Sequence, residues 1–213
     1  DGWSFVQLAR DSYVGFMPSA ALTRDIAPAT HRVHVLRTFS YGGPSIKVPP
    51  LATLSLNSRV AIMGHKDQFA ITHRGHYIFA DHLMAVDQHE TDFVSVAEHF
   101  LGVPYYWGGK TSLGLDCSGL VQNALEAIGH FAPRDTDMQE KALGAPLNIG
   151  DDLSGLKRGD LIFWKGHVGI MRDASEMIHA SGHQMLVVSE PLHIARDRIA
   201  AKGAGPITSM KRI

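Results

Sequence analysis

The stretch that decides the fold of this chain reads Asp116-Cys117-Ser118-Gly119-Leu120-Val121. Cys117 is the only cysteine among 213 residues, which excludes an internal disulfide and a cysteine-based zinc cage. A lone cysteine is most often a small buried hydrophobe. Here it precedes apolar residues spaced along one helix face, a run that Gly129 ends: Leu120, Val121, Ala124, Leu125 and Ile128. The pattern therefore predicts a helix whose first turn carries the cysteine.

The predicted position at the start of a helix favours a reactive thiol. Free N–H groups and the positive end of the helix dipole stabilise a thiolate, so we expect the pKa of Cys117 to fall below its ordinary value of about 8.5. Asp116 and Ser118 are both suitable capping residues. Position alone leaves the inert and the reactive interpretations open, because a thiolate nucleophile also needs an imidazole partner.

Two of the 13 histidines stand in a context that suits this partnership. His167 lies between two predicted strands and is flanked by Gly166 and Gly169, which suit a tight connection. His179 falls in the following strand, so antiparallel pairing would make the two histidines neighbours, with His179 orienting the ring of His167. The HxxH spacings elsewhere in the chain lack nearby cysteine or carboxylate ligands, and we predict no metal site and no cofactor. Four strands are predicted in this region: Leu161–Trp164, Val168–Met171, Met177–His179 and Met185–Val188.

Two patterns of composition meet near residue 90. Upstream, short alternating β segments separated by turn residues predict a small β-barrel at 23–88, and 1–22 read as the last strands of another barrel. Downstream, 89–213 combine helices with antiparallel strands, including a helix from Phe93 that Thr91 or Asp92 can cap. We therefore predict an α+β fold with an all-β part before it.

Overall composition excludes several kinds of partner. The net charge is −1 with no block of like charges, so neither nucleic acid nor an anionic membrane is expected as partner. No apolar run reaches the roughly 18–20 residues of a membrane span, and no secretory signal is visible. The chain opens at Asp1 rather than Met, so we expect an upstream segment to be missing.

Five ordered blocks in 91–213 resemble the NlpC family of papain-like cell-wall cysteine peptidases. They lie at 102–109 (Gly-Val-Pro-Tyr-Tyr-Trp-Gly-Gly), 116–121, 133–139, 159–170 and 178–182. The resemblance implies hydrolysis of the γ-D-glutamyl bond to meso-diaminopimelate in murein stem peptides. It also implies roles: Cys117 as nucleophile, His167 as base, His179 as orienting residue, and Tyr105 as an oxyanion donor beside the Cys117 N–H. A purely structural Tyr105 in an aromatic turn is the alternative.

The same resemblance suggests how a substrate is read. Asp116, Ser118 and Asp135 match substrate-contacting positions of members that require a free N-terminal L-Ala, where a carboxylate would face the ammonium group. The alternatives are helix capping by Asp116 and Ser118, and a loop contact between Arg134 and Asp135.

The part upstream resembles bacterial Src-homology-3-like barrels, which often precede such a peptidase domain. The likeness covers 31–86, and 3–22 resemble the last strands of a second barrel. In two-barrel relatives the first barrel helps read the alanine terminus, so Tyr13 becomes a candidate substrate contact. The acidic barrel residue expected to pair with the amine has no identifiable counterpart.

We therefore expect a cysteine endopeptidase of cell-wall turnover or recycling, acting on L-Ala-γ-D-Glu-diaminopimelate or on intact peptidoglycan. A papain-like amidase or acyltransferase is the alternative with the same nucleophile, and a non-catalytic wall-binding module is the other. One cysteine, no visible signal and no evident anchor favour the cytoplasm, where recycling of free peptides would take place, whereas binding of intact wall would fit the periplasm or cell surface.

Overall fold

The computed structural model describes residues 2–150 and 153–213. The chain divides into two compact units, Asp1–Gln88 and His89–Ile213, and each is described by itself. None of the described helices has both the length and the apolar character that crossing a membrane requires.

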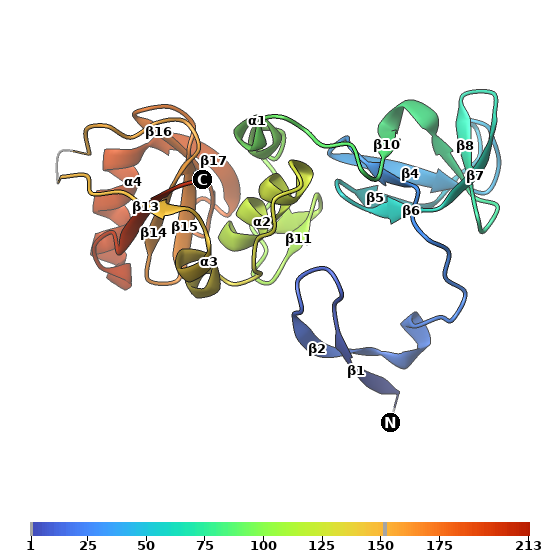
Figure 1. Cartoon of the computed structure of the whole chain (residues 1–213), viewed down its shortest axis with the longest axis horizontal. Helices are drawn as coiled ribbons and strands as arrows, with labels where there is room; N and C mark the ends of the chain where they lie inside the picture. The colour runs from blue at the N-terminus through green and yellow to red at the C-terminus, as the bar shows by residue number, and fades with distance from the viewer. Residues whose placement is uncertain (1, 151–152) are drawn as a thin grey trace. The chain divides into compact units, whose positions relative to one another are not determined.

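The first unit consists of β-strands and short helical turns (Figure 1). Its elements are β1 (Trp3–Gln7), β2 (Val14–Pro18), η1 (Ser19–Ala21), β3 (His31–Val33), β4 (Arg37–Tyr41), β5 (Pro50–Ser55), β6 (Arg59–Val60), β7 (Ile62–Lys66), β8 (Phe69–Thr72), β9 (Tyr77–Phe79), η2 (Ala80–His82) and β10 (Leu83–Ala85). Strands β1 and β2 form an antiparallel pair, as predicted. The others form a sheet of order β10-β3-β6 and a sheet of order β5-β4-β9-β8-β7. The β character is confirmed, whereas closure into a barrel stays a prediction.

The predicted turns of this unit have a clear backbone cause. Asn57 and Asp67 adopt φ values of 64° and 52°, the left-handed region that Asn and Asp tolerate best among residues with a side chain. Asn57 also accepts a 3.0 Å hydrogen bond from the buried guanidinium of Arg32, which in turn donates to the carbonyl of Gln88. These bonds hold the last residue of the unit onto its β-sheet.

The second unit is an α+β domain built on one six-stranded sheet. Its helical elements are α1 (Phe93–Glu98), α2 (Cys117–Ala127), α3 (Thr136–Ala142), α4 (Leu192–Ile199) and η3 (Ala200–Ala204). Its strands are β11 (Lys110–Thr111), β12 (Gly114–Leu115), β13 (Ala145–Pro146), β14 (Asp160–Trp164), β15 (His167–Met171), β16 (Glu176–Ser181), β17 (Leu186–Pro191) and β18 (Ser209–Arg212). The sheet order is β13-β18-β14-β15-β16-β17, and all pairs are antiparallel.

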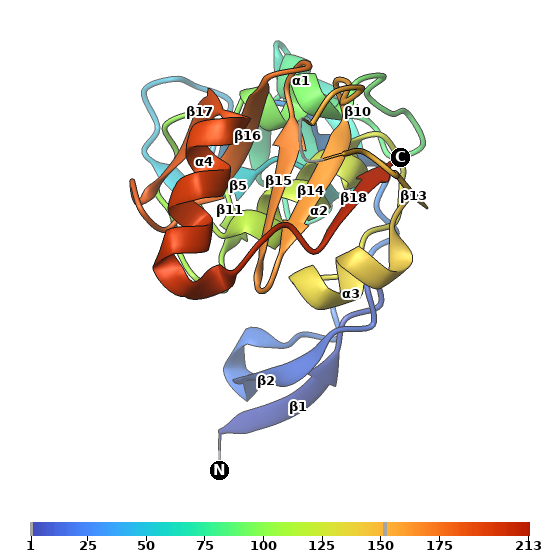
Figure 2. The same ribbon diagram turned by 90° about the vertical axis from the view of Figure 1, so that its left-hand side faces the viewer.

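Helices cover both faces of this sheet. Helix α2 lies on one face and α4 on the opposite face (Figure 1), and the view onto α4 shows β17, β16, β15, β14 and β18 side by side behind it (Figure 2). All five residues of β14 are buried, because strands covered on two faces lose the alternation of apolar and polar residues. Beneath α4 the core contains Ile162, Trp164, Met171, Met177, Leu192 and Ala195.

The structure extends and corrects the predicted elements. Helix α2 and the four strands β14 to β17 are confirmed, and Asp92 caps α1 by accepting a 2.9 Å bond from the N–H of Val94. Helix α1 ends at Glu98, earlier than the apolar spacing indicated. The sequence patterns did not predict α3, α4, β5 or β18.

Candidate active site

Cys117 opens α2 with its side chain almost enclosed. Only 6% of the residue is exposed. Asp116 is the N-cap, in extended conformation, and its Oδ1 accepts a 2.8 Å bond from the N–H of Gly119. The Cys117 N–H lies in the first turn, where N–H groups have no acceptor within the helix. The predicted placement of the thiol at a helix start is therefore confirmed.

Gly119 permits this helix start to approach the preceding loop. A Cβ at position 119 would lie 2.5 Å from the carbonyl oxygen of Gly109, which is fixed backbone. The same oxygen accepts hydrogen bonds from the Asp116 N–H at 3.2 Å and from Arg134 at 3.1 Å. The glycine after Cys117-Ser118 is thus required by close packing between two backbone segments.

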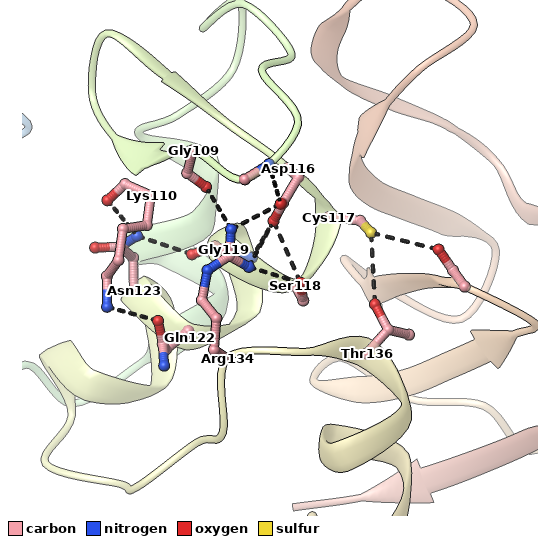
Figure 3. Close-up of polar contacts among 12 residues, drawn as sticks. Gly109, Lys110, Asp116, Cys117, Ser118, Gly119, Gln122, Asn123, Arg134 and Thr136 are labelled. Carbon is pink, nitrogen blue, oxygen red and sulfur yellow. Dashed lines mark hydrogen bonds and ion pairs between the residues drawn. The ribbon is translucent and has the colours of Figure 1, made fainter. Parts of the chain in front are cut away.

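The sulfur of Cys117 lies between residues far apart in the sequence (Figure 3). It lies 3.7 Å from Oγ1 of Thr136 and 4.0 Å from the carbonyl oxygen of Gly166, and the N–H groups of Ser118 and Val168 also donate to it. Burial raises the pKa of the thiol, and the charge of Asp116 raises it further, against the hydrogen bonds that lower it. The predicted lowering of this pKa is therefore wrong: in this enclosed pocket, desolvation outweighs the helix N-terminus.

His167 and His179 form the expected pair. His167 Nε2 lies 2.7 Å from His179 Nδ1, and the rings meet edge to face with centroids 5.0 Å apart. Burial lowers the pKa of His167 to about 3, with the neighbouring His179 as a further cause. Both the imidazole of His167 and the thiol of Cys117 are therefore neutral at rest near pH 7.

The contact of His167 with its partner leaves Nδ1 as the ring nitrogen available to the thiol. Nδ1 is the nitrogen nearer the residue's own main chain, and the sulfur touches the backbone on both sides of it, at Gly166 and Val168. No hydrogen bond joins the Cys117 sulfur to the His167 ring among the residues that the structure describes. Such contacts are often long in unliganded enzymes and shorten when substrate binds.

Two further side chains extend the histidine pair, and the sequence patterns missed both. His179 Nε2 lies 2.7 Å from Oε1 of Glu190, and Arg198 donates to both carboxylate oxygens of Glu190 at 2.5 Å. His179 is 1% exposed as a side chain, Glu190 11% and Arg198 17%. Glu190 stands 11 residues from His179, so strand register alone could have indicated it.

Tyr105 lines the pocket at Cys117, together with Trp107 and Thr136. Burial raises the pKa of Tyr105, and the nearby Cys117 and Asp116 raise it further. Its hydroxyl is therefore protonated near pH 7 and able to donate a hydrogen bond. The pocket measures about 240 Å³.

Asp116 and Ser118 line the pocket of Cys117, and both side chains also make internal contacts. Arg134 donates to Oδ1 of Asp116 at 2.9 Å and to Oδ2 at 2.7 Å, and Oδ2 also accepts from the N–H of Gly108 at 2.8 Å. The Ser118 hydroxyl donates to Asp116 at 3.2 Å and accepts from Arg134 at 2.9 Å. Figure 3 shows this cluster on the side of the helix start away from the thiol. The capping alternative for Asp116 is confirmed, and Arg134 binds Asp116 rather than making the expected loop contact with Asp135.

The structure places Asp135 at the pocket of Cys117 but does not place Tyr13 relative to it. Asp135 precedes α3 and lines the Cys117 pocket, and its carboxylate makes no hydrogen bond or ion pair among residues 2–150 and 153–213. Tyr13 belongs to the first unit, whose placement relative to the second is not determined, so its substrate contact stays a prediction.

A thiol that opens the central helix and a histidine that comes later from an antiparallel sheet define the papain-like class of cysteine peptidase. Residues 102–197 match the model of the NlpC/P60 family, and this part of the chain belongs to that family. The match spans all of the predicted site residues except Tyr13.

Curated relatives carry similar domains. The chain is 40% identical over 98 residues to the gamma-D-glutamyl-L-lysine dipeptidyl-peptidase of Bacillus subtilis, covering 42% of this chain and 31% of that protein. It is 26% identical over 208 residues to the enzyme of the same name from Bacillus cereus, covering 86% of this chain and 61% of that protein. The chain thus spans less than two thirds of the length of either relative.

A solved structure shows the same fold. The crystal structure of an NlpC/P60 family protein from Bacillus cereus superposes with a TM-score of 0.78 at 22% identity, covering 99% of this chain and 76% of that one.

Proposed function

We propose that the chain is a cysteine peptidase that hydrolyses the γ-D-glutamyl–diamino acid bond of murein stem peptides. The observation that carries the proposal is the Cys117 thiol, held at a helix start against the backbone of Gly166 and Val168, on either side of His167, whose ring lies 2.7 Å from that of His179. The names of the two curated relatives, gamma-D-glutamyl-L-lysine dipeptidyl-peptidases, support the substrate class.

The chemistry follows from the neutral resting pair. The sulfur attacks the γ-carbonyl carbon while the thiol proton passes to Nδ1 of His167. The Cys117 N–H and the Tyr105 hydroxyl donate to the oxyanion. When the carbon–nitrogen bond breaks, His167 returns the proton to the leaving amine. Water then attacks the thioester, its proton passes through His167 to the sulfur, and the free thiol is restored.

We propose that Asp135 binds the free amino end of the substrate. Its carboxylate borders the pocket without an internal partner in the described part of the chain, whereas Asp116 is neutralised by Arg134. A charge-assisted bond to an ammonium group is worth about 1.5–3 kcal/mol, or roughly 10- to 150-fold in kcat/KM.

The first test compares L-Ala-γ-D-Glu-diaminopimelate with its N-acetylated form. We expect release of the diamino acid from the free peptide, loss of that activity in Cys117→Ala, and turnover of the acetylated peptide lowered by roughly 10- to 150-fold. Activity that survives Cys117→Ala would refute the assignment of the nucleophile.

A matched pair of variants tests the role of Asp135. Asp135→Asn should abolish the discrimination between the two peptides. Asp137→Asn removes a neighbouring carboxylate that lies 3.4 Å from Lys141, and the discrimination should remain. Equal discrimination in both variants would assign the amine to another group.

Finer parts of the proposal concern the first unit and the cellular setting. We propose that 23–88 form a Src-homology-3-like barrel and that Tyr13 contributes to binding the N-terminal alanine of the substrate. Specificity for free peptides would make recycling of wall fragments in the cytoplasm the setting, and turnover of intact wall would move it to the periplasm or cell surface.

A further inference from the structure

We propose that Glu190, held by Arg198, is a positioning residue that sets the tautomer of His179 and, through it, that of His167. The inference rests on the proposed function only in taking His167 as the base for Cys117. It assigns roles to Glu190 and Arg198, in addition to those of Cys117, His167 and His179.

The sheet places Glu190 beside His179. In the antiparallel pairing of β16 with β17, His179 stands opposite Val188 and Met177 stands opposite Glu190. Glu190 is therefore the diagonal neighbour of His179 on the same face of the sheet. Arg198 reaches the carboxylate from α4, the helix that follows β17 directly. Three successive elements thus bring His179, Glu190 and Arg198 into one line of contacts.

The order of donors and acceptors along this line has one solution. An ionised carboxylate only accepts hydrogen bonds, so His179 Nε2 must carry a proton and donate to Glu190 across 2.7 Å. In neutral His179 the other nitrogen, Nδ1, is then an acceptor. His167 Nε2, 2.7 Å away, must donate to it. The proton of neutral His167 therefore lies on Nε2, and Nδ1 carries the lone pair that takes the thiol proton.

Arg198 keeps the acceptor at the end of the line ionised. Burial would raise the pKa of Glu190, but the hydrogen bonds from His179 and Arg198 prevail and lower it to about 2. The charged groups that act on His167 in the described part of the chain are Glu190 from β17 and Arg198 from α4, besides His179 itself, and the thiol of Cys117 from α2 lies against the neighbouring Gly166. Among these, only Glu190 makes a direct hydrogen bond that dictates which nitrogen of His179 is protonated.

The line of contacts has a counterpart in the same sheet that can serve as a control. Arg212 in β18 donates to both oxygens of Asp160 in β14 at 2.7 Å, and Asp160 is fully buried. This carboxylate–guanidinium pair contacts no histidine among the described residues. Asp160→Asn therefore removes a buried carboxylate charge and its bonds to the partly exposed Arg212 without touching the histidines.

The test uses the full chain and needs no substrate for its central readout. The ¹⁵N chemical shifts of the ring nitrogens report the tautomers of His167 and His179. In the wild type we expect Nε2–H on both rings. In Glu190→Gln the side-chain amide offers both a donor and an acceptor, so we expect a mixture of tautomers on His179 and His167. Asp160→Asn should keep the wild-type shifts.

Kinetics give the second readout. Partners that orient a metal-bound histidine are typically worth about 10- to 100-fold in activity, and we take the same range for this buried pair. We expect kcat of Glu190→Gln to fall by about that factor with KM unchanged, and alkylation of Cys117 by iodoacetamide near pH 7 to slow in parallel. Glu190→Asp should recover part of the loss, because it keeps an acceptor-only carboxylate.

The outcomes separate this inference from the proposed function. Wild-type tautomers and wild-type kcat in Glu190→Gln would overturn the inference, as would equal kinetic losses in Asp160→Asn. If Glu190→Gln does not fold, Glu190→Ala gives the same readouts with no acceptor at this position, and unchanged alkylation and tautomers in that variant would overturn the inference. If the wild type fails to cleave stem peptides while tautomers and alkylation respond as expected, the substrate assignment fails and the inference stands.

Discussion

Removing Arg134 should destabilise the second unit far more than removing a surface cation. In Arg134→Met, Asp116 keeps its charge but loses two hydrogen bonds of 2.9 and 2.7 Å in a site where the two side chains are only 7% and 9% exposed. Removing one partner of a buried ion pair costs about 3–5 kcal/mol, because the remaining charge is buried without compensation. The bonds from Arg134 to Ser118 and to the Gly109 carbonyl are lost as well.

Urea unfolding of the full chain measures this loss. Trp164 is fully buried in the second unit, so the loss of its blue-shifted fluorescence reports the unfolding of that unit. With a urea dependence of about 1–3 kcal/mol per molar, a loss of about 3–5 kcal/mol lowers the midpoint by at least about 1 M. Lys141→Met removes a 3.4 Å pair whose side chains are 78% and 69% exposed, and should cost no more than about 0.5 kcal/mol.

A double substitution distinguishes an unpaired charge from lost packing. Asp116→Asn combined with Arg134→Met leaves no buried charge and should recover part of the stability lost in Arg134→Met alone. A loss below about 1 kcal/mol in Arg134→Met would refute the reasoning. A rise in KM at unchanged stability would instead indicate that Arg134 and Asp116 act in substrate binding.

Three further predictions test the site. The pKa of His167 is about 3 in the folded and about 6.5 in the unfolded protein, so the unfolded chain binds more protons between these pH values, and the free energy of unfolding should fall on acidification from pH 6.5 by up to about 1.4 kcal/mol per pH unit. Urea midpoints measured against pH should fall less steeply in His167→Gln than in the wild type. Equal pH dependence in the two proteins would contradict the lowered pKa. Tyr105→Phe should lower kcat by about 100- to 1,000-fold with little change in KM if its hydroxyl donates to the oxyanion, whereas unchanged kcat would leave it a structural aromatic. Gly119→Ala should abolish alkylation of the folded thiol or prevent folding, because its Cβ meets the Gly109 carbonyl, while Gly64→Ala, with nothing within 4 Å of its Cβ, should behave as wild type.

The sequence predicted what depends on local spacing. Helix α2 was predictable because its cap, its apolar face and its terminating glycine lie within one short run. The contact between His167 and His179 was predictable because two neighbouring strands with glycines between them pair antiparallel. Helix α4 was missed because it is only eight residues long and begins after Pro191, which provides no side-chain capping bond to mark its start.

What failed depended on contacts between distant segments. The raised pKa of Cys117 comes first from burial, and the sulfur is buried among segments as distant as Thr136 and Gly166, 19 and 49 residues away, a burial that no local pattern reports. The ion pair of Asp116 with Arg134, 18 residues away, is another contact that no local pattern reports, whereas a substrate contact of Asp116 stays a prediction. Glu190 carries no motif of its own and acquires meaning only from the register between β16 and β17.

The enclosed, neutral thiol of Cys117 has a consequence for its resistance to oxidants. Peroxide reacts with the thiolate, so a thiol with a raised pKa and 6% exposure is oxidised slowly while the site is empty. If a sulfenic acid does form, this sequence offers no second cysteine to trap it as an internal disulfide. Further oxidation would then be irreversible, so keeping the sulfur protonated while the site is empty protects it from peroxide.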